Sequence, residues 1–327
     1  MLRLAETPYS LAMRWRNARY DTGRAKCTQF DVPVVCVGNL TLGGTGKTPM
    51  VEWLARWLRA RGLRVTLISR GYGADDGAPN DEALELEQKL PDVPHLQNPD
   101  RVAAARFAVE ELECEAIVLD DGFQHRRLAR DLDIVLLDAL EPFGYGHVFP
   151  RGLLREPASG LRRAEVVVLS RADLIDAAAR ARIRAEVERL APDAAWAEVI
   201  HAPQRLLNSL GEEQSLDALR GTRVAAFCGL GNPTGFRRTL ESCGCTLAGF
   251  REFPDHHAYT RADVESLATW AAELQAALVV CTHKDLVKLK CEVIGRVPLV
   301  ALAIGIEFLT GREALETQLE AILTPRV

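Results

Sequence analysis

Six consecutive residues have the types found in a phosphate-binding loop: Gly43, Gly44, Thr45, Gly46, Lys47 and Thr48. Glycines let backbone N–H groups approach phosphate oxygens, and the N-terminus of a following helix adds a positive field. Lys47 supplies a charge for the terminal phosphates, and Thr48 supplies a hydroxyl for a divalent cation. These residues predict a site for the phosphates of ATP with Mg²⁺.

The context and one departure qualify this prediction. A buried strand is expected at 33–39 and a helix at 49–61, and such a loop requires this strand–loop–helix order. The strict pattern has glycine at position 41, where this chain has Thr41. The loop is therefore expected to be a variant whose first glycines are Gly43 and Gly44. The alternative is a glycine-rich turn with an incidental Lys-Thr pair.

A pair of acidic residues at the end of an apolar strand is the expected second half of the site. Asp120 and Asp121 follow the run 116–119, and either carboxylate could hold Mg²⁺. Asp138 ends another apolar strand and competes for this role. The structural alternative is a pair of carboxylates that only caps the end of a strand.

The elements around these residues predict an α/β fold. Apolar strands without alternation are expected at 64–69, 116–119, 133–138 and 165–170, with helices between several of them, which is typical of a parallel sheet covered on both faces. We predict a P-loop NTPase-type domain at 1–195 that includes an N-terminal basic amphipathic helix. A second strand–helix series predicts a smaller α/β/α domain at 205–327, joined to the first by strands near 196–204 and 299–307.

Composition excludes several classes of protein. The 327 residues carry a formal net charge of −5, which argues against a nucleic-acid-binding protein. The eight cysteines form no C-x-x-C pair and are expected to be buried thiols. No stretch approaches the ~18 continuous apolar residues of a spanning helix, and charges interrupt any apolar run near the N-terminus, so we expect neither a spanning helix nor a signal peptide. The protein is expected to be cytoplasmic, with a basic helix near residues 11–18 that either packs on the body or lies on a lipid surface.

Several longer strings resemble those of the tetraacyldisaccharide 4'-kinases, the lipid A 4'-kinases. The strings run in order along nearly the whole chain and are more specific than a P-loop alone. They are the segments at 37–39 (VGN), 69–73 (SRGYG), 80–82 (NDE), 120–125 (DDGFQH), 150–157 (PRGLLREP), 229–233 (GLGNP) and 253–257 (FPDHH).

The resemblance implies a function and a set of roles. It implies transfer of the γ-phosphate of ATP to the 4'-hydroxyl of a tetraacylated glucosamine disaccharide 1-phosphate in lipid A biosynthesis, with Mg²⁺, on the cytoplasmic face of the inner membrane. It points to Asp81 as the base, supported by His256 from the second domain, and adds Glu156 near the metal. It also makes a lipid-surface role for the N-terminal helix the favoured interpretation.

The resemblance is incomplete at two positions. Asn80 stands where the acidic-loop motif usually has glycine, and the string Thr-Glu-Lys-Asp is replaced by Thr282-His283-Lys284-Asp285. Further polar residues are candidates without an assigned role: Arg70, Arg101, Arg151, Arg155, His125 and Asn232. Two other functions stay open from the residues alone. One is a different P-loop kinase or ligase, and the other is a nucleotide switch of the GTPase type.

Overall fold

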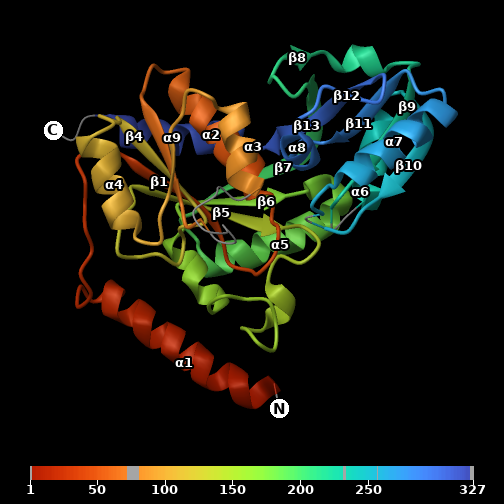
Figure 1. Ribbon diagram of the computed structural model, residues 1–327. Helices are drawn as coiled ribbons and strands as arrows, with labels where there is room; N and C mark the ends of the chain where they lie inside the picture. Colours follow the sequence, from red (N-terminus) through yellow and green to blue (C-terminus); the bar gives the residue numbers. More distant parts are fainter. Residues whose placement is uncertain (1, 72–80, 231–232, 256, 325–327) are drawn as a thin grey trace. The chain divides into compact units, whose positions relative to one another are not determined.

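The computed structural model describes residues 2–71, 81–230, 233–255 and 257–324, and the chain divides into two compact units (Figure 1). The first unit comprises Met1–Tyr72, Asp92–His201 and Ile306–Val327. The second comprises Gly73–Pro91 and Ala202–Gly305. Two long strands, β7 (Ala195–Leu207) and β13 (Val297–Thr310), pass from one unit into the other.

The first unit alternates strands and helices. Its strands are β1 (Val34–Asn39), β2 (Val65–Ser69), β3 (His95–Gln97), β4 (Ala116–Asp120), β5 (Leu132–Asp138) and β6 (Val166–Ser170). Its helices are α1 (Leu2–Asp21), α2 (Lys47–Arg59), α4 (Arg101–Glu110), α5 (Ala177–Leu190) and α9 (Arg312–Leu323), with short 3₁₀ turns η1 (Gly144–Gly146), η2 (Ala158–Arg163) and η3 (Ala172–Leu174).

The strands of the first unit form a parallel sheet in the order β6-β5-β1-β4-β2-β3. In this register Val37 of β1 lies opposite Asp120 of β4 on one side and Ile134 of β5 on the other. Parallel strands end at one edge, so the residues after β1, β4 and β5 share that edge. Ligands of open α/β sheets bind there.

Helices cover both faces of this sheet, as the apolar strands require. Side chains of α4 and α5 share one apolar cluster with alternate strand residues such as Cys36 and Leu119. Helix α2 packs on β1 and β4, and α9 packs on β5, from the other side (Figure 1). The predicted α/β class, with a mostly parallel sheet covered by helices, is confirmed.

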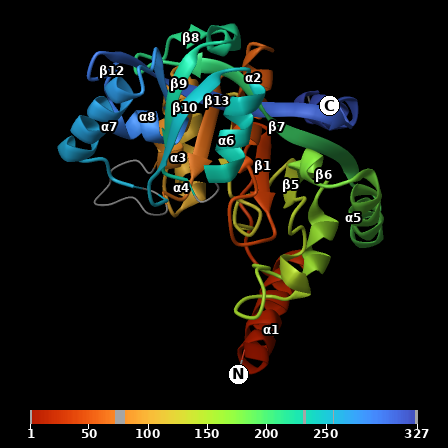
Figure 2. The same ribbon diagram turned by 90° about the vertical axis from the view of Figure 1, so that its right-hand side faces the viewer.

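The second unit is smaller. Its elements besides the shared strands are α3 (Asp81–Lys89), β8 (Glu213–Gln214), η4 (Leu216–Leu219), β9 (Arg223–Cys228), α6 (Pro233–Ser242), β10 (Thr246–Glu252), α7 (Arg261–Glu273), β11 (Leu278–Thr282), α8 (His283–Leu289) and β12 (Val293–Ile294). The parallel strands follow the order β10-β9-β11-β13, and β12 pairs antiparallel with β13. Helix α6 packs on one face, and α7 and α8 pack on the other (Figure 2).

The observed units differ from the predicted boundaries in two places. Residues 306–327 group with the first unit, because α9 buries Leu315 and Leu319 and Phe308 packs edge-on against Trp53 of α2. Residues 73–91 group with the second unit, because α3 packs against α8. Neither α3 nor β3 was expected from the sequence, since both are short and flanked by loops. The N-terminal helix, expected near residues 11–18, begins at Leu2 and contains Pro8.

Candidate active site

The glycine-rich loop connects β1 to α2, as predicted. Gly43 and Gly46 have φ angles of 111° and 79°, which side-chain-bearing residues rarely adopt, and Gly46 caps the N-terminus of α2. Thr41, at the position where the strict pattern has glycine, is buried and forms a backbone bridge with Leu154. The departure at Thr41 is therefore accommodated by pairing with a second loop instead of by a free glycine turn.

The underside of the loop rests on side chains from β6 and β7. The Ser170 hydroxyl lies 3.1 Å from Nε2 of His201, and a Cβ added to Gly46 would come within 2.3 Å of that imidazole. Burial, assisted by the nearby Arg171 guanidinium, lowers the pKa of His201 to about 4. The imidazole beneath the loop is therefore neutral near pH 7, and glycine is the residue that fits above it.

Arg171 explains what Asp138 does. Its guanidinium donates to the carbonyl oxygen of Gly44 at 2.8 Å and pairs with the Asp138 carboxylate. Asp138 is thus engaged in holding the loop through Arg171. Sequence analysis missed Ser170, Arg171 and His201; the available signal was that polar residues follow the apolar runs at the same edge as Asp120 and Asp138.

Asp121 lies between two cations. Lys47 Nζ is 3.5 Å from its carboxylate, and one guanidinium nitrogen of Arg155 donates to both of its oxygens at 2.8 and 2.9 Å. Burial raises the pKa of Asp121, but Lys47 and Arg155 outweigh it and hold the pKa below its usual value. The cluster brings together residues that are distant in the sequence, since Lys47 precedes Asp121 by 74 positions and Arg155 follows it by 34.

The donor set at this edge suits Mg²⁺. Asp120 is buried at the end of β4, and Thr48 lies in the first turn of α2, so a carboxylate and a hydroxyl are offered beside the loop. The buried Thr45 hydroxyl has no hydrogen-bond partner in the part of the chain that the structure describes. No three His, Cys, Asp or Glu side chains of the described residues could jointly hold a metal. Mg²⁺ does not require three, because phosphates and water commonly complete its shell.

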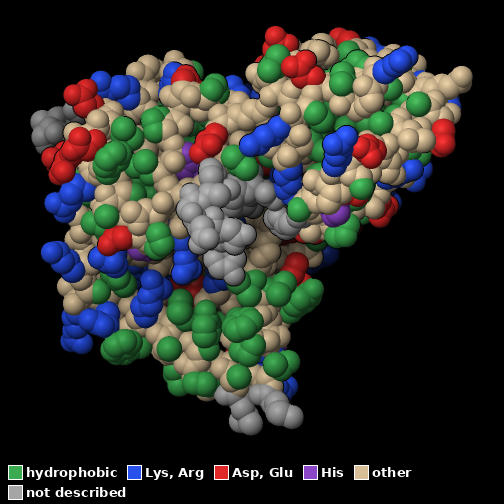
Figure 3. Space-filling view, viewed as in Figure 1, with side chains coloured by type: hydrophobic (Ala, Val, Ile, Leu, Met, Phe, Trp, Pro, Cys, Tyr) green, Lys and Arg blue, Asp and Glu red, His purple; other side chains and the backbone are tan. Residues whose placement is uncertain are grey.

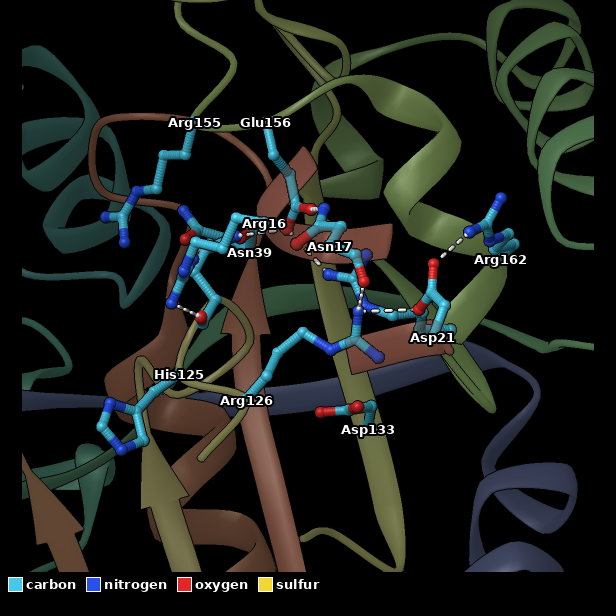
Figure 4. Close-up of polar contacts among 12 residues, drawn as sticks. Arg16, Asn17, Asp21, Asn39, His125, Arg126, Asp133, Arg155, Glu156 and Arg162 are labelled. Carbon is cyan, nitrogen blue, oxygen red and sulfur yellow. Dashed lines mark hydrogen bonds and ion pairs between the residues drawn. The ribbon is translucent and has the colours of Figure 1, made fainter. Parts of the chain in front are cut away.

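Glu156 is fully buried and joins three segments (Figure 4). Its carboxylate accepts from Asn17 of α1 at 2.6 Å, from Gln124 at 3.1 Å and from Arg163 of η2 at 2.8 Å. Both oxygens thus have protein donors in this arrangement. The metal-ligand role of Glu156 stays a prediction.

The arginine candidates have different surroundings. Besides Arg155, the buried Arg101 donates to the backbone carbonyl of Asp121 at 3.4 Å, while Arg151 pairs with Glu6 of α1. Arg70 is exposed. Burial, followed by the charges of nearby arginines, lowers the pKa of His125 to about 4. His125 is therefore neutral near pH 7, in a cationic environment that would favour an anion.

Of the two residues expected to act on the acceptor hydroxyl, one lies within the described part of the chain. Asp81 is the first residue of α3, in the second unit. His256 lies outside the described residues, as do Asn80 and Asn232. The described residues that flank the histidine motif, in β10 and α7, also belong to the second unit. We expected Asp81 in the first domain and the histidine motif in the second; the observed grouping differs because α3 packs on α8.

Comparison with known proteins decides the family. The model of the tetraacyldisaccharide-1-P 4'-kinase family matches residues 1–324. This chain is a member of the tetraacyldisaccharide-1-P 4'-kinase family. A protein named tetraacyldisaccharide 4'-kinase from Anaeromyxobacter sp. (strain K) is 46% identical over 344 residues, covering 98% of this chain and 90% of the relative. One of the same name from Geobacter metallireducens is 38% identical over 340 residues, covering 99% and 98%.

A solved structure agrees with the family assignment. The crystal structure of LpxK from Aquifex aeolicus in complex with ATP superposes with a TM-score of 0.78 at 30% identity and covers 97% of both chains. The predicted family and fold are therefore confirmed, and so is the predicted enzyme class, a kinase. Membership in the 4'-kinase family also bears on how the remaining features are interpreted, above all helix α1.

Helix α1 of this 4'-kinase family member has one bound face and one exposed face. Glu6, Asn17 and Asp21 make ion pairs or hydrogen bonds to the body of the first unit. On the other face Leu11 and Trp15, one helical turn apart, are 60% and 65% exposed. Figure 3 shows apolar side chains gathered in the lower part of the view, where α1 lies. The helices within the described residues are too short or too polar to cross a membrane.

Proposed function

We propose that this chain transfers the γ-phosphate of ATP to the 4'-hydroxyl of a tetraacylated glucosamine disaccharide 1-phosphate. The observation that carries the proposal is the Lys47–Asp121–Arg155 cluster beside the glycine loop, within a chain that matches the 4'-kinase family from end to end. Two cations face a single carboxylate there, so an added phosphate would meet a net positive site. The ATP bound to the Aquifex aeolicus protein supports the choice of nucleotide.

The residues of the loop would bind and orient the nucleotide. Backbone N–H groups at the start of α2 and the Lys47 ammonium would neutralise the terminal phosphates, and Arg171 would keep the loop in shape through the Gly44 carbonyl. Thr48 with Asp120 or Asp121 would hold Mg²⁺, which supplies further positive charge to the transferred group when bound. Phosphoryl transfer requires little more than this positioning and charge neutralisation.

The acceptor hydroxyl needs a base. Asp81 is the proposed base, with His256 as its partner, and a carboxylate in this role contributes roughly 10²–10⁴-fold in rate. The two would act together if both reach the 4'-hydroxyl. Asp81→Ala should then lower kcat strongly while ATP binding, which depends on the first unit, is retained.

The apolar face of α1 favours a lipid acceptor over a water-soluble one. Leu11 and Trp15 alternate with the exposed Arg14 and Arg19, and a helix of this kind lies in the headgroup layer of anionic bilayers. We therefore propose that the protein is peripheral on the cytoplasmic face of the inner membrane. A ligase or kinase of soluble substrates gives no reason for this exposed stripe.

A nucleotide switch of the GTPase type would need an aspartate that reads guanine, and Asp285 of the Thr-His-Lys-Asp string is the residue to consider for that role. A guanine-reading aspartate must keep its carboxylate available for the base. Asp285 is fully buried and accepts from the Thr282 hydroxyl at 2.6 Å, the Tyr259 hydroxyl at 2.9 Å and the backbone N–H of Gly229 at 3.1 Å. The Thr-His-Lys-Asp segment is thus used internally.

The deciding experiment measures transfer of labelled γ-phosphate from Mg-ATP to tetraacyldisaccharide 1-phosphate in detergent micelles. Wild type should phosphorylate the lipid. Lys47→Ala should lower the rate by at least ~100-fold, because the ammonium group that neutralises the terminal phosphates is lost. Lys290→Ala, which removes an exposed lysine of the second unit, is the matched control and should be unaffected. Wild-type protein that binds ATP without phosphorylating the lipid would refute the proposed acceptor.

A further inference from the structure

Helices α3 and α8 of the second unit are joined by a cluster of buried polar side chains that the proposed reaction does not use. Lys89 Nζ lies 2.8 Å from Oε1 of Glu85, and both residues are buried on α3. His283, the first residue of α8, is 3% exposed. Its Nε2 lies 2.7 Å from Oε1 of Gln88 on α3, and its Nδ1 lies 3.8 Å from Oε1 of Glu85.

The cluster extends to a third segment. Nε2 of Gln88 donates to the backbone carbonyl of Ser209 at 3.3 Å, so the amide bridges His283 on one side and the loop after β7 on the other. Burial raises the pKa of Glu85, but Lys89 and then His283 outweigh it and hold the pKa well below its usual value. The carboxylate therefore stays charged, although it is buried.

Burying these charges is costly in free energy, and apolar residues of similar size would hold two helices together at least as well. What a directional cluster adds is a defined rotation and translation of one helix on the other. A slide of α3 along α8 by one residue, about 1.5 Å, would lengthen or misalign the 2.7 Å contact between His283 and Gln88. The cluster is thus suited to fixing the position of α3.

The position of α3 matters because the helix begins with Asp81, four residues before Glu85. Misplacement of a reacting group by about 1 Å can cost roughly 100-fold in rate. We propose that His283 is a positioning residue, which acts through Gln88 and Glu85 to hold α3, and with it Asp81, in place for the acceptor hydroxyl. This inference rests on the proposed function, in which Asp81 is the base.

The proposal also accounts for a departure from the family pattern. His283 stands in the string Thr-His-Lys-Asp where the resembling family has Thr-Glu-Lys-Asp. A glutamate at this position would add a second negative charge close to the buried Glu85, whose carboxylate lies 3.8 Å from Nδ1 of the present His283. In this chain the imidazole can instead donate toward that carboxylate or toward Gln88.

The test is steady-state kinetics of lipid phosphorylation by the full chain. His283→Ala should lower kcat about 10- to 100-fold with KM for ATP within about 2-fold, because the glycine loop lies in the other unit. His283→Gln, which keeps a side-chain donor for Gln88, should recover most of the rate. Arg261→Ala, which removes an exposed ion pair with Glu265 on α7, is the control and should match wild type.

A double mutant separates positioning from general support of the fold. In the Asp81→Ala background, His283→Ala should lower the residual rate by less than about 2-fold, because the group that it positions is gone. An equal loss in both backgrounds, or a fully active and folded His283→Ala, would overturn the inference while leaving the proposed function intact. Full activity of Asp81→Ala would instead overturn the proposed base, and the inference with it.

A second variant covers the case in which His283→Ala does not fold. Gln88→Leu keeps the size of the side chain and removes only the bridging amide. It should reduce kcat in the same direction, with an unchanged ATP KM and an unchanged thermal midpoint within a few degrees. A wild-type kcat for this variant would contradict the proposal.

Discussion

The parallel strands of the two units end in similar sequence patterns, but the carboxylates at these ends have different contacts. In each, a glycine-containing loop follows a buried strand, and an aspartate follows or caps a neighbouring strand. Asp121 of the first unit is 35% exposed at its side chain and faces two flexible cations, Lys47 and Arg155. Asp285 of the second unit is fully buried and accepts only internal donors, including the Gly229 N–H.

Under the proposed function, this difference separates an edge that binds phosphate from an edge that is structural. Cations near a partly exposed carboxylate can exchange it for a phosphate, since the lysine and arginine side chains are long and the carboxylate keeps contact with water. A buried carboxylate with three kinds of donor cannot be replaced by a phosphate in the same way, because its movement would leave those donors unsatisfied. The comparison makes predictions in which the two edges respond differently.

The largest effect is expected from Gly46→Ala. A methyl group there would lie 2.3 Å from His201 and 2.9 Å from the Ser170 hydroxyl, at a φ of 79°. The loop would have to shift, so ATP binding should weaken by at least ~100-fold in calorimetry. Gly62→Ala is the matched control, because Gly62 has a φ of 84° and no atom within 4 Å of the added Cβ. Equal ATP affinity in the two variants would refute the close fit beneath the loop.

The next effect contrasts the two aspartates directly. Asp285→Ala should lower the free energy of unfolding of the second unit by roughly 3 kcal/mol, since the Gly229 N–H and the Tyr259 and Thr282 hydroxyls lose a charged acceptor. Denaturant unfolding measures this loss, and ATP affinity should be unchanged. Asp121→Ala should do the opposite, with unfolding altered by less than about 1 kcal/mol and phosphate transfer reduced by at least ~100-fold. Similar stability losses in both variants would erase the distinction.

A smaller effect concerns the surfaces of the units. Replacing Leu11 and Trp15 together by serine should weaken binding to vesicles with anionic headgroups about 10-fold or more, because apolar area that would enter the bilayer is removed. Leu210→Ser, which alters a 68% exposed leucine of the second unit, is the control for the loss of an exposed apolar residue. Vesicle flotation measures the bound fraction. If the double variant bound as well as wild type, α1 would not be the membrane surface.

The smallest effect is a dependence of stability on pH in the first unit. Burial lowers the pKa of His95 to about 4, as it does for His125 and His201. Their unfolded pKa is about 6.5, so between pH 6.5 and 4 the unfolded chain binds protons that the folded unit does not. The contribution of these histidines to stability is complete above pH 6.5 and declines toward pH 4, by about 1 kcal/mol each after allowance for partial exposure.

Thermal unfolding at pH 7 and pH 5 measures this dependence. The midpoint should fall by about 5 °C over that interval. Nε2 of His95 lies 2.9 Å from the Ser69 hydroxyl, and His95→Gln keeps a polar group there that cannot be protonated. This variant should reduce the fall by about a third. An unchanged fall in the variant would assign the pH dependence to other groups.

The sequence by itself determined those features that depend only on residues adjacent along the chain. The strand, the glycine loop and the helix from Val34 to Arg59 are contiguous, so residue types alone predicted their order and the chemistry of Lys47 and Thr48. The apolar runs predicted the parallel sheet, because strands buried on both faces must be apolar throughout. The family strings then predicted the family, the enzyme class and the candidate residues Asp81, His256 and Glu156.

Only the tertiary structure decided which polar groups meet. Asp121 directly follows one apolar strand and Asp138 ends another, and nothing local indicates that the first faces Lys47 while the second pairs with Arg171. The same holds for His201, which reaches Gly46 from β7, and for Glu85 and His283, which lie 198 positions apart in the chain and meet between α3 and α8. Packing of helices and register of strands set these pairs, and both arise from the apolar core as a whole rather than from any short segment.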